Sequence, residues 1–204
     1  MKNDPFSANE TLRTINARRS TRMFLDNPVD DDALRIILHA ANQAPSAHNQ
    51  QSCRFIVLTG TKKAELSALV LDKAANFPKP SSTLLRLASR SMNSAPVVIA
   101  IANTGDLISR GAGLFNLDDE AAFDFFRIME IQSSAAAVQN LLLAATAIGL
   151  STVWLGVLVL IKDDILQFIG EPKGEFMAVI PVGYPAQESS GPKKKSLEMV
   201  IKYI

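Results

Sequence analysis

The chain has 204 residues, is 48% hydrophobic and carries a formal net charge of +1 at pH 7. This length favours a single domain (1–204) with a sizeable core, and the near-neutral charge argues against nucleic acid as a partner. One cysteine, Cys53, excludes an internal disulfide framework. The first ten residues are polar and lack the apolar segment of a signal peptide, so we expect a soluble, cytoplasmic protein.

Two helices are predicted near the start of the chain. Ser7 and Glu10 have the spacing of a capping box, which predicts a helix over residues 8–17. A second helix is predicted over residues 28–43, because acidic residues in its first turn suit the helix dipole.

A dense cluster of hydrogen-bond donors lies between these two helices. Three guanidinium groups occur within five residues, with two hydroxyl groups between them. Arginine presents a planar fork that suits phosphate or carboxylate, and serine adds a short neutral donor. Taken alone, the cluster fits either an anion site or a solvated basic turn. Its main members are Arg18, Arg19, Ser20 and Arg22.

A polar loop of small and amide side chains, residues 44–52, separates the second helix from a predicted strand at residues 55–58. We call it the amide loop. Asn, Gln and Ser offer both donors and acceptors, which suits the edge of a heterocycle better than a charged group. An ordinary surface connection is the alternative interpretation.

The middle of the chain alternates helices and strands. One helix begins near Thr61 and ends before two prolines; another covers residues 83–92 and leads into a strand at residues 97–101. Arg86 and Arg90 share one face of that second helix. Residues 103–117 contain three glycines and little periodicity, and together with the next two residues they form an excursion of about 103–119 that resembles a substrate lid. The acidic residues from Asp118 onward begin the next helix.

A charge-free run over residues 131–161 forms the centre of the chain. Residues 133–148 are rich in Ala and Leu and predict a helix buried on most sides. Gly149 is a suitable stop, and the β-branched residues 151–157 predict a strand. A membrane span is the alternative, but polar residues interrupt the run. A helix buried all round in so small a chain would need a second subunit to cover it.

The remaining segments are a short helix at residues 163–169, a strand at residues 176–182 and a C-terminal arm at about residues 186–204 that carries three consecutive lysines. There is no Gly-rich nucleotide-binding fingerprint, no P-loop and no hydrolase elbow. With one cysteine and two histidines, a metal site is not expected. No residue set suits difficult chemistry unaided, which points to an organic cofactor.

Taken together, the motifs resemble the nitroreductase family of FMN-dependent oxidoreductases over about residues 12–200. The resemblance depends on order and spacing, because each motif is weak alone. The motifs are Arg18-Arg19-Ser20-x-Arg22-x-Phe24, Ala44-Pro45-Ser46-x-x-Asn49-x-Gln51, Ala95-Pro96-Val97-Val98, Gln139-Asn140-Leu141-Leu142-Leu143-Ala144-Ala145 with Gly149-Leu150, Trp154-Leu155-Gly156, Gly183-Tyr184-Pro185 and the basic pair Lys193 and Lys195.

The resemblance implies an α+β fold: a central mixed, mostly antiparallel sheet flanked by helices, a long buried central helix, and an interlocked homodimer with FMN at the interface. It assigns no covalent catalytic residue and no metal. It places Arg22 and Arg90 as charge stabilisers near flavin N1 and O2, where reduction leaves negative charge. The implied FMN-binding residues are Arg18, Arg19, Ser20 and Arg22; Pro45, Ser46, Ala47, Asn49 and Gln51 from the other subunit; Arg90; Trp154; Leu155 and Gly156 through their backbone N–H groups; and Lys193 and Lys195.

The implied activity is hydride transfer from NADH or NADPH through flavin N5 to an oxidised aromatic acceptor, a nitro compound or quinone, by a ping-pong mechanism. The alternatives are flavin fragmentation, dehalogenation, ene reduction, or flavin storage without turnover. Three positions depart from the family pattern: Ser52 and Cys53 occupy positions that are often Pro and Trp, and Lys195 one that is often Arg. The first two put in doubt any substrate preference taken from the family.

Overall fold

The computed structural model describes residues 7–111, 113, 118–187 and 190–204. Its centre is a sheet with strand order β1-β2-β4-β3, and each neighbouring pair of strands is antiparallel. The one parallel contact is an isolated bridge between Ser20 and Thr152 among the described residues. The expected α+β fold with a mostly antiparallel sheet is therefore confirmed. The strands are β1 (Cys53–Leu58), β2 (Val97–Asn103), β3 (Ser151–Thr152) and β4 (Glu175–Gly183).

Strand β2 is buried along its whole length, and its side chains alternate between two cores. Val97, Ile99 and Ile101 pack into the core on one face of the sheet. Val98 and Ala100 pack into the core on the other face. Because successive side chains of a strand point to opposite faces, a run this apolar requires a sheet covered on both sides.

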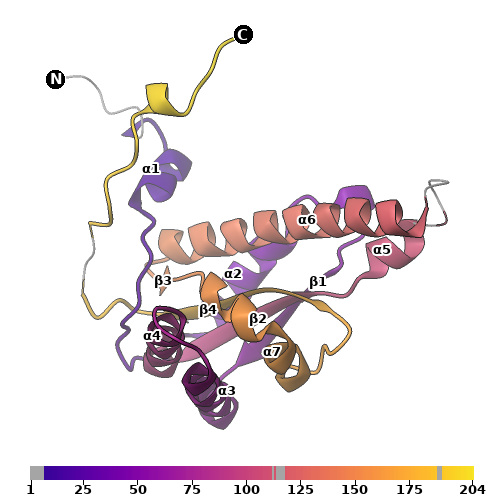
Figure 1. Cartoon of the computed structure of the whole chain (residues 1–204). Helices are drawn as coiled ribbons and strands as arrows, with labels where there is room; N and C mark the ends of the chain where they lie inside the picture. Colours follow the sequence, from indigo (N-terminus) through magenta and orange to yellow (C-terminus); the bar gives the residue numbers. More distant parts are fainter. Residues whose placement is uncertain (1–6, 112, 114–117, 188–189) are drawn as a thin grey trace.

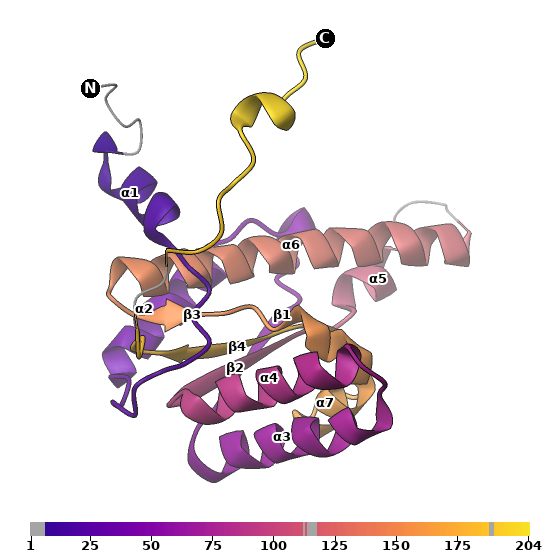
Figure 2. The same ribbon diagram turned by 60° about the vertical axis from the view of Figure 1, so that its left-hand side comes forward.

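Helices supply both covers (Figures 1 and 2). α2 (Asp31–Asn42) and α6 (Asp119–Ala147) lie on one face. On the other face lie α3 (Gly60–Lys73), α4 (Ser81–Ser94) and α7 (Lys162–Phe168), with the short 3-10 helices η3 (Ala74–Asn76) and η4 (Gly156–Ile161).

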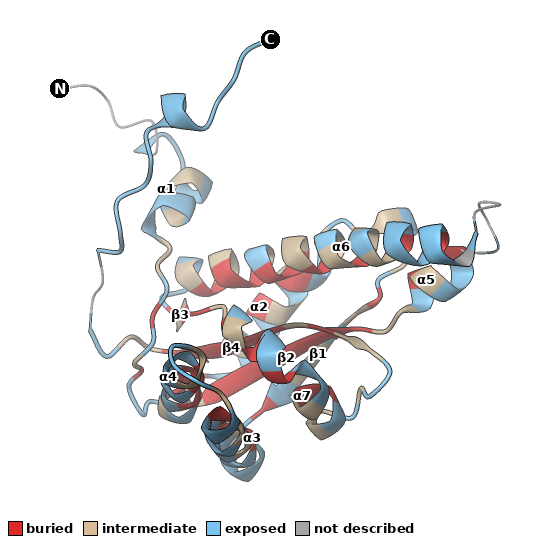
Figure 3. Ribbon diagram, in the orientation of Figure 1, coloured by how far each residue is buried: buried red, intermediate tan, exposed pale blue. Residues whose placement is uncertain are grey.

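The long helix α6 spans two segments that were predicted separately from the sequence. These are the acidic helix start near Asp118 and the Ala/Leu-rich residues 133–148. Asp118 caps it by accepting a hydrogen bond from the N–H of Ala121, and it ends before Gly149, whose φ is +82°. Its sheet-facing side is buried, whereas the opposite side is exposed in the single chain (Figure 3). Within the described ranges, no helix is long and apolar enough to cross a membrane.

Two local expectations are wrong, and the excursion contains an element that was not expected. Asn9 caps α1 (Glu10–Ala17), in place of Ser7. The strand expected over residues 151–157 stops after Thr152, and η4 begins at Gly156. The excursion contains a helix, α5 (Asp106–Gly111), which packs against α6 through Leu107 and Phe126. Residues 112 and 114–117 of the excursion lie outside the described residues.

Helix α1 and the C-terminal residues lie beyond the compact body. Helix α1 and the C-terminal arm, with its 3-10 turn η5 (Leu197–Met199), project to the same side of the molecule (Figures 1 and 2). Apolar side chains of the arm are exposed: Met199 by 70% and Tyr203 by 91%. The arm thus contributes little to the core of its own chain.

Replacing Lys63 by Met is expected to lower the free energy of unfolding by about 1–2 kcal/mol. The Lys63 ammonium donates to the carbonyl oxygens of Asn93 (3.1 Å) and Ala95 (2.6 Å), at the C-terminus of α4, where a cation also suits the helix dipole. Lys62→Met is the matched control, because Lys62 pairs with Glu65 on the exposed surface and should cost under about 0.5 kcal/mol. Urea denaturation of both variants measures the difference, and equal losses would contradict the capping role.

Candidate functional site

The arginine-rich segment connects α1 to the edge of the sheet. The N–H of Arg18 donates to the carbonyl oxygen of Thr14 (3.0 Å) and ends the helix. Two residues further on, Ser20 bridges to Thr152 of β3, and the N–H of Thr21 donates to the Thr152 carbonyl oxygen (2.9 Å). The edge strand thereby holds the segment extended.

A cationic cleft of about 510 Å³ lies between this segment and the C-terminal arm. Four cationic side chains line it, and no carboxylate of the described residues does. None of the ion pairs formed by described residues involves Arg18, Arg22 or Lys194. Within the described residues, the positive charge of the cleft is therefore not neutralised by an ion pair. The lining residues are Ile15, Asn16, Arg18, Arg19, Ser20, Arg22, Gly191, Pro192 and Lys194.

Arg19 has a different role from its neighbours. Its guanidinium donates to the carbonyl oxygens of Ser190 (2.8 Å), Asn16 (2.5 Å) and Arg18 (2.8 Å). It therefore attaches the C-terminal arm to the wall of the cleft. A Cβ on Gly191, whose φ is +67°, would lie 2.8 Å from Cδ of Arg19, so this close approach requires glycine.

The lysine that lines the cleft differs from the expected pair. Lys194 lines it, whereas Lys193 and Lys195 do not. In an extended chain, alternate side chains point to opposite sides. The family pattern pointed to Lys193 and Lys195. Which lysine faces the cleft depends on the path of the arm, which the sequence does not show.

The amide loop is held against the middle of α6. It contains the 3-10 turn η2 (Ala47–Asn49); the N–H of Ala47 donates to Oγ of Ser133 (3.1 Å), and the N–H of Gln51 donates to Oγ of Ser46 (3.2 Å). His48, Asn49 and Gln51 all have positive φ, between 52° and 55°. Left-handed residues other than glycine are uncommon, and such strained positions cluster at ligand sites.

The cationic cleft and the amide loop lie far apart in one chain. The loop contacts α6 at Ser133, and a hollow behind the cleft is lined by Arg19 and Thr146. These two contacts are 13 residues apart along α6, which corresponds to about 20 Å of helix. A single protomer therefore brings together Arg18, Ser20 and Arg22, and separately Pro45, Ser46 and Ala47, but not the two groups.

The turn before η4 is hydrogen-bonded to the sheet at one position. The N–H of Leu155 donates to the Val179 carbonyl oxygen (3.0 Å), so it is engaged within the fold. Gly156 is exposed, and a Cβ there would meet only the Trp154 ring, at 3.9 Å. Arg90 is exposed on α4 and does not line the cationic cleft.

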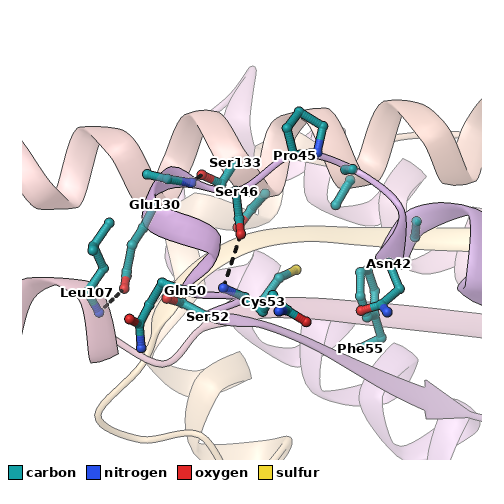
Figure 4. Close-up of a pocket in the computed structure, with 16 residues that line it drawn as sticks. Asn42, Pro45, Ser46, Gln50, Ser52, Cys53, Phe55, Leu107, Glu130 and Ser133 are labelled. Carbon is teal, nitrogen blue, oxygen red and sulfur yellow. Dashed lines mark hydrogen bonds between the residues drawn. The ribbon is translucent and has the colours of Figure 1, made fainter.

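A small chamber lies between the amide loop and α6 (Figure 4). Cys53 lines this chamber, and burial raises the pKa of its thiol to about 11, although a hydrogen bond with Ser134 and the charge of Arg54 act in the opposite direction. Sequence reasoning noted Cys53 as the single cysteine, and Ser52 and Cys53 as departures from a family pattern, without placing either in a chamber. It gave no role to Glu130, which also lines the chamber.

At pH 8 the Cys53 thiol is expected to react with a disulfide reagent far more slowly in the folded protein than in urea, because the thiolate is the reactive form. Folding raises the pKa of this thiol. The contribution of the neutral thiol to folding stability is therefore fully present below the unfolded pKa of 9.0, and it is lost as the pH rises towards the folded pKa of about 11. Cys53→Ala should therefore lose less stability than the wild type between pH 9 and 11. Equal losses in the two proteins would contradict the raised pKa.

The fold and the site define an α+β protein with a cleft lined by arginine and lysine side chains. The sequence profile described as "Nitroreductase family" matches residues 15–184. The chain is 27% identical over 184 residues to the "Putative NADH dehydrogenase/NAD(P)H nitroreductase" of Archaeoglobus fulgidus, covering 88% of this chain and 87% of that protein. The chain belongs to the nitroreductase family.

Solved structures agree with that assignment. A "putative nitroreductase in complex with fmn" from Desulfovibrio desulfuricans is 30% identical and has a TM-score of 0.70, covering 96% of this chain and 98% of that one. The NADPH:FMN oxidoreductase of Vibrio harveyi, complexed with NAD+, is 24% identical with a TM-score of 0.75, over 96% and 77% of the two chains, and shares the fold. The nitroreductase-like fold is therefore confirmed.

Proposed function

We propose that this FMN-dependent NAD(P)H oxidoreductase transfers a hydride from the nicotinamide to an oxidised aromatic acceptor, a nitro compound or a quinone, in a ping-pong cycle. Family membership and the FMN in the D. desulfuricans structure support the enzyme class and the cofactor. The observation that carries the proposal is the cleft whose cations Arg18, Arg22 and Lys194 have no acidic partner among the described residues.

The residues of the cleft fit the phosphate of FMN. A phosphate near two negative charges accepts several charge-assisted hydrogen bonds, and arginine matches it with two parallel donors. Arg18, Ser20 and Lys194 supply such donors, while Arg19 holds the arm that carries Lys194. Arg22 extends the positive charge toward the flavin ring, and we keep Lys193 and Lys195 as flanking charges.

A homodimer is part of the proposal. In one chain the cleft and the amide loop lie at separate points along α6, so a complete site needs the amide loop of a second protomer. The exposed side of α6 supports this arrangement, because Phe125 and Ile128 are 42–51% exposed there. These two residues are three apart and share a face of the helix, and large apolar side chains exposed together are typical of an interface. Pro45, Ser46, Ala47, Asn49 and Gln51 of one protomer would then face the flavin held by the other.

The chemistry that FMN supplies when bound is reversible acceptance of a hydride at N5. The chain's own residues bind and orient. Arg22 would provide fixed positive charge for N1 and O2 of bound FMN, with Arg90 as a second candidate, and such preorganised charge lowers the barrier where negative charge develops. Gly156 leaves backbone space beside Trp154 for the ring edge. We also propose a cytoplasmic location, supported by the single, unpaired Cys53.

Two measurements test the function. The visible spectrum of the purified protein should show flavin bands, and heating should release FMN. Bound flavin should then bleach under anaerobic NADH or NADPH, and menadione should restore the oxidised spectrum. Flavin that stays oxidised with both nucleotides would contradict the proposal and favour a storage protein. Parallel-line kinetics with the two substrates would support the ping-pong order, and intersecting lines would contradict it.

A further inference from the structure

The C-terminal arm reaches the cationic cleft as an exposed segment. Residues 190–204 are all exposed, and the arm leads away from the compact body (Figure 2). Lys194 nevertheless lines the cleft. A segment that buries so little of its own surface belongs to the least stable part of a fold, where local opening costs little free energy. The position of Lys194 therefore depends on how the arm is attached beside the cleft.

Arg19 provides an attachment between the arm and the end of α1. Its Nε donates to the carbonyl oxygen of Ser190 in the arm (2.8 Å). One terminal nitrogen of the same guanidinium donates to the carbonyl oxygens of Asn16 (2.5 Å) and Arg18 (2.8 Å). Gly191 packs closely on this side chain, because a Cβ at that position would lie 2.8 Å from Cδ of Arg19. One side chain thus joins the two walls of the cleft.

The charges of the cleft make this attachment sensitive to a bound anion. Arg18, Arg22 and Lys194 line one cleft, and no ion pair formed by described residues includes them. Like charges in a shared cleft repel one another, which opposes the approach of Lys194 to the two arginines. A phosphate accepts charge-assisted hydrogen bonds from both walls and replaces that repulsion by attraction. Phosphate binding should therefore favour the attached position of the arm.

We propose that the C-terminal arm and the phosphate of FMN bind cooperatively, and that Arg19 is the positioning residue that couples them. The inference rests on the proposed function. Arg19 holds the arm, and the arm brings Lys194 to the cleft, so Arg19 acts through Lys194. By linkage, the attached arm strengthens FMN binding by the same factor by which FMN strengthens the attachment. The gain in affinity appears mainly as slower release of FMN.

A double-mutant cycle on FMN affinity tests the coupling. Arg19→Met and Lys194→Met should each weaken binding about tenfold, the lower end of what a charge-assisted hydrogen bond contributes. The double variant should also lose only about tenfold, because Arg19 has no further effect once Lys194 is gone. A loss of about 100-fold, the product of the two single losses, would show that Arg19 acts without the arm and would overturn the inference.

Lys202→Met is the control for the cycle. Lys202 is an exposed residue of the same arm and does not line the cleft. Its replacement removes one positive charge from the arm and should change FMN affinity by less than about twofold, because solvent screens an exposed charge at a distance. A loss equal to that of Lys194→Met would show that only the net charge of the arm matters, and it would overturn the inference.

A pair of glycines tests the attachment without removing a charge. In Gly191→Ala the new Cβ would displace Arg19, so FMN binding should weaken about as much as in Arg19→Met. Gly170→Ala is the matched control, because Gly170 also has a positive φ (+80°, against +67° for Gly191) but nothing lies within 4 Å of its Cβ position. Alanine strains the backbone at both positions. Equal FMN affinity in the two variants would overturn the inference.

Limited proteolysis reports on the attachment itself. Trypsin cleaves after the exposed residues Lys193, Lys194 and Lys195, and mass spectrometry measures the loss of the C-terminal fragment. Cleavage of a transiently opened segment follows the population of the open form. FMN should slow this cleavage about tenfold in the wild type, the factor that linkage requires, and inorganic phosphate should slow it in part. In Arg19→Met most of the protection by FMN should be lost.

The outcomes separate this inference from the proposed function. Wild-type protein that binds no FMN would overturn both. Wild-type protein that binds FMN and is reduced by NADH or NADPH, but whose arm is cleaved equally fast with and without FMN, would overturn the coupling alone. Unchanged protection of the arm by FMN in Arg19→Met would also overturn it, because another residue would then hold the arm.

Discussion

Replacing Arg18 and Arg22 together by alanine is expected to weaken FMN binding by about 100-fold or more, because each charge-assisted hydrogen bond contributes about 1.5–3 kcal/mol. Both side chains line the cationic cleft, and neither pairs with an acid among the residues described in the structure. Titrating the apoprotein into FMN, whose fluorescence reports binding, measures the change. The loss should be larger at low ionic strength, where exposed charges are less screened.

Arg13→Ala is the control for that experiment. Arg13 lies on α1, a few residues before the cleft, and pairs with Glu10 on the surface (3.2 Å). The control substitution removes one positive charge, against two in the double variant, from the same region of the chain without touching the cleft lining. Wild-type affinity in the Arg18/Arg22 double variant, or an equal loss in Arg13→Ala, would place the phosphate elsewhere.

Leu141→Ala is expected to lower the free energy of unfolding by about 3 kcal/mol, within the range measured for buried leucines. Leu141 is fully buried and belongs to the core shared with Ile37 of α2 and Ile99 of β2. Removing its side chain leaves a cavity between the central helix and the sheet, because the surrounding elements relax only partly. Urea denaturation, monitored by circular dichroism, measures the loss.

Leu71→Ala is the matched control, because Leu71 lies on α3 and is 46% exposed. Its cost should stay within about 0.5 kcal/mol. Protein and FMN concentrations must be the same for both variants, since ligand binding and association raise apparent stability by mass action. A similar cost for the two substitutions would contradict the central position of α6 in the core.

Local patterns predicted most of the elements that build the core. The β-branched run that starts at Val97 predicted β2, and the Ala/Leu-rich residues 133–148 predicted the second half of α6, because burial on one or both sides selects those residue types. The boundaries were less accurate. Asn9 and Ser7 are both good capping residues, and the choice between them depends on where α1 meets the rest of the chain.

The site could be predicted only in part. The residue types indicated an anion site at the arginine cluster and a hydrogen-bonding loop at residues 44–52. The sequence alone could not say that Arg19 holds the C-terminal arm through Ser190, or that Lys194 lines the cleft in place of its neighbours. Both facts depend on how two segments about 170 residues apart pack together, and such contacts leave no local pattern.

The sequence by itself determined the fold class, the apolar central helix and the family, because periodicity and motif order are local properties of the chain. Tertiary structure alone decided three things. The Val179 carbonyl engages the N–H of Leu155, the cationic cleft and the amide loop lie apart along α6, and Glu130 is buried beside the chamber next to the amide loop. Each of these three features depends on contacts between segments that are distant in the sequence. Such contacts are set by the packing of the whole chain around the sheet.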